Sequence, residues 1–278
     1  MSWWESILLG LLQGLTEFLP VSSSGHLELG KALFGIEDGG LMFTVLVHGA
    51  TALSTVVVFR KDILKITVDL FANSPDGAQA RRFTGWILLS MIPVAVVGFT
   101  ARDYLEAHAT GNTALVGAAL LCTSALLWFA HRKHAQFAAR TDQNEHRLLS
   151  IRPAVMMGLA QAVAVIPGIS RSGATISTGL LLGLSPATAA RFSFLMVLPP
   201  ILGATLLEVK ALLAAPAVEA SSALISSPAV LALGAAAAFF SGLWACSWMM
   251  RGLVRGGLKV FAVYCAAAGA LSLIVSYV

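Results

Sequence analysis

The sequence predicts an all-α, polytopic membrane protein built as an inverted-topology repeat, with six transmembrane helices and two re-entrant helical hairpins. Three observations predict this class. The chain has 278 residues and is 57% hydrophobic and 12% charged, which is about half the charged fraction of a soluble domain. Apolar runs long enough to cross a bilayer recur along it. A polar motif also occurs twice, because QGLTEFLPVSSSGH at 13–26 returns as QAVAVIPGISRSGA at 161–174, 148 positions later.

The first element is predicted to be a hairpin and not a complete span. Residues 3–18 form a helical run near 24 Å long at about 1.5 Å per residue, which is shorter than the ~30 Å hydrocarbon core. Pro20 ends this helix, SSSG turns the chain, and a second short helix is expected from about Ser24 to Leu33. Such a re-entrant hairpin must be covered by protein or border a water-filled cavity.

Six continuous apolar runs are expected to span the membrane. They cover about 43–59, 84–101, 113–130, 190–213, 228–250 and 257–277. Between the third and the fourth, residues 153–166, Pro167, the turn GISRSG and residues 174–182 repeat the hairpin plan. The predicted organisation is a first repeat at 1–130, a cytoplasmic linker at 131–152 and a second repeat at 153–278. Because each repeat has an odd number of spans, the second is inverted, and the two hairpins should meet near the midplane.

The distribution of basic residues predicts the orientation. Of the 18 Lys and Arg residues, 13 lie within 60–82, 132–152 and 251–259, the loops after the first, third and fifth spans. Cytoplasmic loops are enriched in Lys and Arg, so this side is expected to face the cytoplasm. Both termini and the mouth of the first hairpin are then extracytoplasmic. The N-terminus has no basic n-region and no cleavage site, so no cleaved signal peptide is expected.

Several ionisable side chains in the apolar chain indicate chemistry. Glu17 lies four residues after Gln13 on one helix face. A carboxylate in a membrane helix costs at least ~2.5–3.5 kcal/mol, so Glu17 predicts a metal ligand or a general acid/base, with a structural ion pair as the alternative. Arg171 has a planar fork that suits a phosphate, and a salt bridge with Glu17 is its alternative role. His26 follows three hydroxyls, whereas the lone His48 of the first span is interpreted as structural.

The two Ser/Gly turns predict an anion-binding site. Ser22, Ser23, Ser24 and Gly25 precede one helix, and Ser170, Ser172 and Gly173 precede the other. Backbone N–H groups at a helix N-terminus form a phosphate site when hydroxyls accompany them, although such turns also serve as plain helix caps.

Together these residues predict phosphoryl transfer. Arg171 and the N–H groups would stabilise charge on the equatorial oxygens. Ser23 is expected to attack phosphorus or to orient the nucleophile, with His26 as its proton acceptor, and the two roles exchanged are the alternative. A site buried in the bilayer predicts a substrate with a lipid tail and an anionic head.

At these motifs the chain resembles the undecaprenyl-diphosphate phosphatase family of the bacitracin-resistance type. The matching segments are QGLTEFLPVSSSGH and PGISRSGATIS, and the resemblance covers essentially the whole chain. It implies hydrolysis of undecaprenyl diphosphate to undecaprenyl phosphate, in the bacterial cytoplasmic (inner) membrane, at a site that opens to the periplasmic side. It implies roles for Gln13, Glu17, Ser22, Ser23, His26, Ser170, Arg171, Ser172 and Thr175.

The resemblance also implies a divalent cation, Mg²⁺ or Ca²⁺, as cofactor. Gln13 and Glu17 occupy the family's E/Q-xxx-E pattern and are the expected metal ligands. A glutamine is only a neutral ligand, so the cation is expected to bind largely through diphosphate oxygens, as Mg²⁺ commonly does.

Two alternative functions share some of these features: a lipid phosphatase of the phosphatidate type and a flippase. Lipid phosphatases of the phosphatidate type need a second histidine after their SR motif, and no histidine follows His146, so this alternative is discounted. Inverted repeats are also a transporter architecture, so a polyprenyl-phosphate flippase stays an alternative. The expected partner is the membrane lipid undecaprenyl diphosphate; no nucleic acid is expected, and the sequence leaves a homodimer open.

Overall fold

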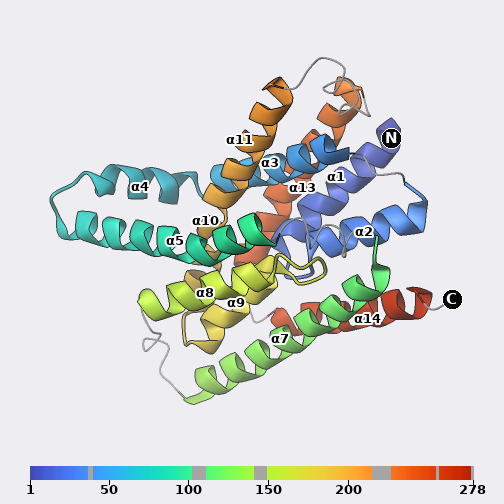
Figure 1. The fold of residues 1–278 in the computed structure, drawn as a ribbon. Helices are drawn as coiled ribbons and strands as arrows, with labels where there is room; N and C mark the ends of the chain where they lie inside the picture. Colours follow the sequence, from blue (N-terminus) through green and yellow to red (C-terminus); the bar gives the residue numbers. More distant parts are fainter. Residues whose placement is uncertain (37–39, 102–110, 141–148, 215–226, 255–256, 277–278) are drawn as a thin grey trace.

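The computed structural model describes residues 1–36, 40–101, 111–140, 149–214, 227–254 and 257–276, and the regular structure in these ranges is entirely helical (Figure 1). In chain order the helices are α1 (Trp3–Phe18), α2 (Ser23–Phe34), α3 (Gly40–Val58), α4 (Arg60–Leu70), α5 (Pro75–Thr100), α7 (Thr113–Arg140), α8 (Ile151–Val163), α9 (Arg171–Leu181), α10 (Pro186–Met196), α11 (Leu198–Ala214), α13 (Pro228–Val254) and α14 (Leu258–Ser276). The predicted all-α class is confirmed.

The helices are those of a multi-pass membrane protein. Within the described residues, five helical segments are long and apolar enough to cross a membrane. A sixth is added when α3 and α4, bent by 73° at their junction, are counted as one span. Each of the six predicted apolar runs overlaps one of these segments.

Three helices differ in extent from the expected spans. A helix, α4, follows α3 directly where a loop was expected. α5 begins earlier than expected, because Ser74 caps its first turn and Pro75 occupies a first-turn position that favours proline. α7 continues to Arg140, into the range 131–152 expected to be the linker, of which 141–148 lies outside the described residues.

The expected span at 190–213 is divided into two helices. α10 ends at Met196 and α11 begins at Leu198. Pro199 and Pro200 follow the break. Because proline has no N–H, it is tolerated in the first turn of a helix and disruptive in the interior, so a new helix begins here.

Pairs of short helices occupy the positions of the two predicted hairpins. α1 begins with a capping box, in which Ser2 Oγ accepts from Glu5 N at 3.4 Å and Glu5 Oε2 accepts from Ser2 N at 2.7 Å. It ends before Pro20, because the residue that precedes a proline is restricted to extended backbone. α2 ends at Gly35, whose left-handed φ of 61° closes the helix. α8 and α9 repeat this plan in the second half.

Helices of the two halves pack in matched pairs. α1 packs against α13, and α8, which is the counterpart of α1 at the 148-residue offset, packs against α5. α7 and α14 lie side by side, and α3 packs against α11 (Figure 1). Gly10 of α1 lies against the backbone of Gly234, and Gly158 of α8 lies against that of Ser90. A Cβ at either glycine would clash with that backbone, so the same close approach occurs at equivalent places.

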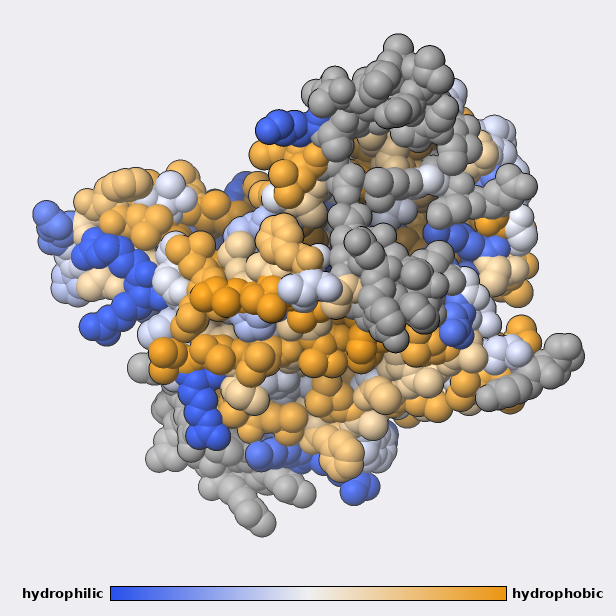
Figure 2. All heavy atoms as spheres, in the orientation of Figure 1, coloured by the Kyte–Doolittle hydropathy of each residue, from blue (hydrophilic) through white to orange (hydrophobic). Residues whose placement is uncertain are grey.

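Hydrophobic residues cover much of the outer surface. Figure 2 shows them across the middle of the view, over α5 and α8, while hydrophilic residues gather at the outer edges. Leu88, Ile92 and Val96 of α5 are each more than half exposed. A broad exposed apolar surface marks contact with lipid or protein, and here it lies on a helix long enough to cross the bilayer.

Candidate active site

The turns of the two hairpins contact each other. Gly25, at the start of α2, lies against Gly168 of the second turn, and a Cβ there would be 3.1 Å from Gly168 Cα. Gly173, at the start of α9, lies against Pro20 of the first turn, with 3.4 Å between the corresponding Cβ positions. The two contacts are equivalent in the repeat, because Gly25 corresponds to Gly173 and Pro20 corresponds to Gly168 at the 148-residue offset. The glycines predicted to bind phosphate thus allow the hairpins to approach closely.

Each turn is closed by a serine that caps the following helix. Ser22 Oγ accepts from Gly25 N at 3.3 Å, and Ser170 Oγ accepts from Gly173 N at 3.0 Å. Ser22 holds a left-handed φ of 70°, which is uncommon for a residue with a side chain. The capping role that was an alternative for these serines is therefore present in both copies, and it brings the N-termini of α2 and α9 to the contact between the hairpins.

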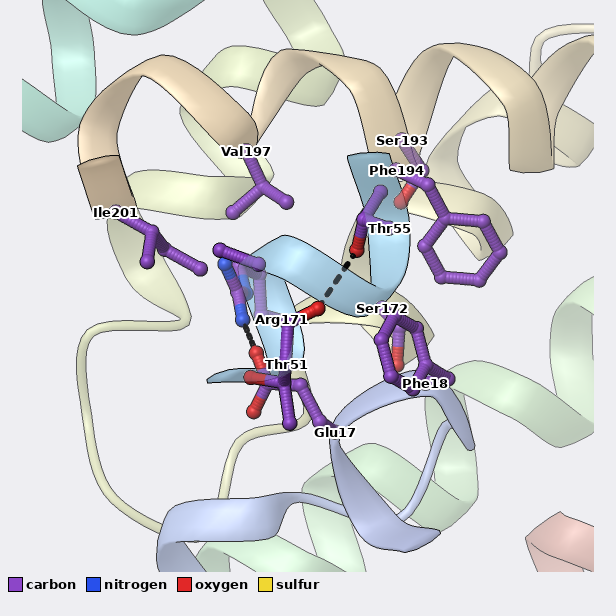
Figure 3. A pocket seen from close by; sticks show the side chains of 11 residues that line it. Glu17, Phe18, Thr51, Thr55, Arg171, Ser172, Ser193, Phe194, Val197 and Ile201 are labelled. Carbon is purple, nitrogen blue, oxygen red and sulfur yellow. Dashed lines mark hydrogen bonds and ion pairs between the residues drawn. The ribbon is translucent and has the colours of Figure 1, made fainter. Parts of the chain in front are cut away.

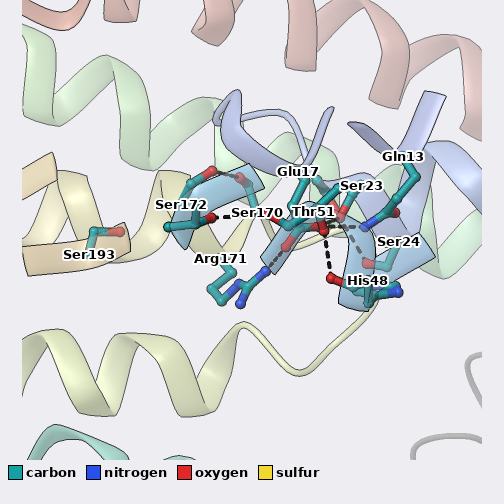
Figure 4. Close-up of polar contacts among 12 residues, drawn as sticks. Gln13, Glu17, Ser23, Ser24, His48, Thr51, Ser170, Arg171, Ser172 and Ser193 are labelled. Carbon is teal, nitrogen blue, oxygen red and sulfur yellow. Dashed lines mark hydrogen bonds and ion pairs between the residues drawn. The ribbon is translucent and has the colours of Figure 1, made fainter. Parts of the chain in front are cut away.

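A buried carboxylate joins the two hairpins. Glu17, which is 8% exposed, accepts hydrogen bonds at Oε2 from Gln13 Nε2 at 2.9 Å and from Ser23 Oγ at 2.5 Å. Its Oε1 forms an ion pair with Arg171, the first residue of α9 (Figure 4). The salt bridge that was an alternative role for Arg171 is therefore present. Glu17 accepts from donors of both halves, which makes it the centre of a mixed acid, hydroxyl and guanidinium cluster.

His26 lies outside this cluster. Its Nδ1 is 2.8 Å from Ser22 O, and its Nε2 is 2.7 Å from the hydroxyl of Tyr264 in α14. The two rings also stack, with centroids 5.5 Å apart. Both ring nitrogens thus have partners other than Ser23, whose hydroxyl is donated to Glu17. The Ser23–His26 hydrogen bond expected from their spacing does not form, because the histidine points along α2 toward α14.

A cavity of about 290 Å³ opens beside the cluster. This volume is near the lower end of the roughly 300–1,000 Å³ of ligand pockets. One wall is polar and combines both turns: Glu17, Ser22, Ser23, Ser24, Ser170, Arg171 and Ser172. The apolar lining residues come from α5, α10–α11 and the second turn: Val94, Ala164, Val165, Ile169, Val197, Pro200, Ile201 and Ala204. The cavity is therefore amphipathic.

A second, smaller space of about 20 Å³ is also lined by Glu17 and Arg171. Figure 3 shows this ion pair together with Thr51 and Thr55 of α3 and the apolar Val197 and Ile201, which line the same space. It is no larger than a site for a water molecule. Of the two spaces that Glu17 and Arg171 line, only the larger cavity has room for a substrate headgroup.

Two predicted phosphate-binding residues have other contacts. Thr175 is fully buried, and its hydroxyl lies 2.6 Å from Ser193 Oγ and 2.8 Å from Arg171 O. It borders neither cavity. Ser172 borders both, but its hydroxyl donates to Leu19 O at 3.0 Å. Ser172 thus joins the second hairpin to the first, while Thr175 joins α9 to α10.

Among the cavity residues that were not assigned to the site from the sequence are Gln161 and His48. Gln161 borders the larger cavity, and the signal for it was available, because it is the repeat counterpart of Gln13. His48 borders the same cavity from α3, with Nδ1 2.8 Å from Thr44 O. A lone histidine in an apolar run carries no pattern that predicts this, so only the packing of α3 beside the hairpins reveals it.

Comparison with known proteins gives consistent relationships over the whole chain. The model of the family "Bacitracin resistance protein BacA" matches residues 6–271. A Bacteroides fragilis protein named undecaprenyl-diphosphatase is 46% identical over 277 residues, covering 99% of both chains. Relatives of the same name from Parabacteroides distasonis and Oceanobacillus iheyensis are 46% and 38% identical, over 98% and 96% of this chain and 98% and 94% of their own.

Proposed function

The chain belongs to the bacitracin resistance protein BacA family, and on this basis we propose that it hydrolyses undecaprenyl diphosphate to undecaprenyl phosphate and inorganic phosphate. The protein is accordingly a membrane-bound undecaprenyl-diphosphatase, and its activity recycles the lipid carrier of cell-wall synthesis and fits a role in bacitracin resistance. The observation that carries the site assignment is the Glu17–Ser23–Arg171 cluster beside an amphipathic cavity.

The shape of the cavity supports a lipid diphosphate as substrate. The polar wall carries hydroxyls, an arginine and two helix N-termini, which suit phosphate oxygens. The apolar wall, formed by residues such as Val94 and Ile201, suits the first units of a prenyl chain. The diphosphate then lies against the hairpin turns, and the chain leaves between α5 and α11.

Glu17 is proposed as the general base. Ser23 Oγ donates its hydrogen bond to the Glu17 carboxylate at 2.5 Å, so Glu17 can accept the hydroxyl proton when Ser23 attacks phosphorus. The Oγ–P bond forms on the terminal phosphorus, the bridging P–O bond breaks, and Glu17 passes the proton to the departing undecaprenyl phosphate. Water then attacks the phosphoserine, with Glu17 relaying its proton to Ser23 Oγ. In the alternative route, water attacks the terminal phosphorus directly, Ser23 orients the water molecule, and Glu17 again accepts the proton.

Arg171 is proposed to bind the terminal phosphate. A guanidinium carries five N–H donors, and the ion pair with Glu17 uses NH2. The remaining donors and the N-terminus of α9 would stabilise the charge on the equatorial oxygens. His26 is proposed as a positioning residue, since its ring ties Ser22 O to Tyr264 and so fixes the turn that carries Ser23. The exchanged assignment, with His26 as nucleophile, predicts a phosphohistidine in place of a phosphoserine.

A divalent cation, Mg²⁺ or Ca²⁺, completes the proposal. Gln13 Oε1 is a buried oxygen without a hydrogen-bond partner, on the side chain whose Nε2 contacts Glu17. Gln13 and Glu17 would hold the cation, which supplies charge neutralisation of the diphosphate when bound. Within the described residues no three His, Cys, Asp or Glu side chains form a metal-binding group, which suits a cation held largely by substrate oxygens.

The proposed architecture is an inverted repeat of residues 1–130 and 153–278 around a cytoplasmic linker. It is supported by the matched packing of α1 on α13 and α8 on α5, and by the reciprocal contacts of Gly25 and Gly173. The bias of basic residues supports a cytoplasmic location for 60–82, 132–152 and 251–259. The site then opens to the periplasmic side of the inner membrane.

Release of inorganic phosphate tests the function. Purified protein in detergent should release one phosphate for each undecaprenyl diphosphate consumed, and Glu17→Gln protein should release almost none. The family relationship supports hydrolysis and not the flippase alternative. A protein that moves polyprenyl phosphate between leaflets of vesicles but releases no phosphate would overturn this assignment.

A further inference from the structure

Gln161, in α8, is a buried amide without a hydrogen-bond partner. Its side chain is 2% exposed, and neither Nε2 nor Oε1 has a partner in the structure. Buried amides are normally satisfied, because leaving one unpaired carries a desolvation cost. Gln161 also borders the 290 Å³ cavity that contains Glu17, Ser23 and Arg171. An unsatisfied amide in the wall of a substrate cavity indicates a ligand contact.

The repeat explains why this amide has no protein partner. In the first hairpin, Gln13 donates to Glu17, four residues later. The residue four positions after Gln161 is Val165, which offers no acceptor. The second copy of the motif therefore keeps the glutamine but lacks a carboxylate that could accept a hydrogen bond from it.

The position of Gln161 indicates which of the two phosphates of the headgroup it contacts. Ser23 and Arg171 lie on the polar wall and are assigned to the terminal phosphate. Val165, one turn after Gln161 on the same hairpin, belongs to the apolar wall that is assigned to the prenyl chain. Gln161 borders the cavity one turn before this apolar residue, which favours the phosphate that stays on the lipid over the terminal phosphate as its ligand.

We propose that Gln161 binds the retained phosphate of the lipid diphosphate, with Nε2 donating to one of its oxygens. This inference rests on the proposed function. It makes Gln161 a specificity-determining residue, because a ligand that has only the terminal phosphate does not reach it. Oε1 accepts from a water molecule or from a protonated oxygen of the same group.

The test compares Gln161→Met with the wild-type protein. Methionine keeps the length and shape of the side chain and removes both polar atoms. The Michaelis constant for a prenyl diphosphate should rise about tenfold to hundredfold, equivalent to about 1.5–3 kcal/mol at 1.4 kcal/mol per factor of ten. The inhibition constant of inorganic phosphate, which occupies the terminal site alone, should not change. Leu159→Ala, at an exposed position of the same helix, serves as the matched control.

Thermal unfolding gives a readout that does not depend on turnover. The ligand-free Gln161→Met protein should unfold at the wild-type temperature or above it, because an unsatisfied buried amide has been removed. A non-hydrolysable bisphosphonate analogue of a prenyl diphosphate should raise the unfolding temperature less than in the wild type.

The outcomes separate the two proposals. If wild-type protein releases no phosphate from the lipid, the proposed function fails. If wild-type protein is active and Gln161→Met leaves both the Michaelis constant and the analogue-induced stabilisation unchanged, only the role of Gln161 is wrong. A variant that weakens prenyl diphosphate and inorganic phosphate equally, with lower ligand-free stability, assigns Gln161 to structure and also overturns the inference.

Discussion

Ser172 donates its hydroxyl to the carbonyl oxygen of Leu19 at 3.0 Å, and so joins the start of α9 to the end of α1. Arg171 immediately precedes the donor, and Glu17 lies two residues before the acceptor. This hydrogen bond therefore fixes the relative position of the two ionised groups. Ser172 is better explained as part of the support of the site than as a phosphate ligand.

The first prediction follows from that hydrogen bond. Ser172→Ala should lower the free energy of unfolding by about 0.5–1.5 kcal/mol, the usual net worth of one hydrogen bond. Turnover should fall, because the ion pair is less well positioned, while the inhibition constant of inorganic phosphate stays near the wild-type value. A large loss of phosphate affinity with normal stability would instead make Ser172 a phosphate ligand.

The second prediction concerns the carboxylate. Glu17→Gln should reduce turnover by roughly 10²–10⁴, because the proton acceptor is lost, and should weaken the dependence on divalent cation. Glu28→Gln changes a carboxylate of the same hairpin that pairs with Lys31 and does not border the cavity, so it is the matched control. Equal activity and equal cation response in both variants would assign Glu17 to a structural ion pair.

The third prediction separates Ser23 from His26. Because Ser23 contacts Glu17 and His26 contacts Tyr264, Ser23→Ala should abolish most turnover while costing no more stability than the loss of one hydrogen bond. His26→Ala should be severely impaired as well, but with a lower unfolding temperature. Acid quenching during turnover, followed by mass spectrometry, should locate any trapped phosphate on Ser23. A phosphorylated His26 would show that the two roles are exchanged.

The fourth prediction concerns Arg171. Arg171→Lys keeps the charge and loses the planar fork, so turnover should fall by roughly 10²–10³. Arg171→Ala should in addition destabilise the protein by about 3–5 kcal/mol, since Glu17 is left as an unpaired buried charge. Arg191→Lys, which changes an ion pair with Asp62 outside the cavity, controls for the loss of a guanidinium in general. Near-normal kinetics of Arg171→Lys would exclude fork-like phosphate binding.

The fifth prediction tests the orientation. A reporter that is active only in the cytoplasm should be active when inserted near Arg140 and inactive when fused after Val278, because the basic loops are expected inside. The opposite pattern would place the mouth of the first hairpin on the cytoplasmic side.

The sequence predicted the structure best at helix ends, where neighbouring residues such as proline and serine determine the backbone. Pro20 and the serine caps set the ends of α1, α2 and α9, and these ends were predicted to within a few residues. The Glu17–Arg171 pair was foreseen as an alternative, because an intramembrane charge needs a partner. The helix break at Val197 was not predicted, although Pro199 and Pro200 follow it; the segment Pro186–Leu207 nevertheless remains one apolar span.

Long-range contacts that involve no intramembrane charge pair could not be predicted from the chain. His26 meets Tyr264 across 238 positions, and no local pattern connects a histidine in a turn to a tyrosine in the last helix. Spacing along α2 instead suggested Ser23, three residues away. Whether a side chain faces its own helix or another one depends on packing, which the sequence alone does not specify.

The 154 positions between Glu17 and Arg171 have a consequence for biogenesis. At synthesis rates of about 5–20 residues per second, roughly 8–30 s separate the emergence of the carboxylate from that of its cationic partner. During this interval the nascent first half carries an uncompensated acid in or near the bilayer, which must be protonated, hydrated or shielded by the insertion machinery. Chains that terminate before the second hairpin never acquire the cationic partner of Glu17.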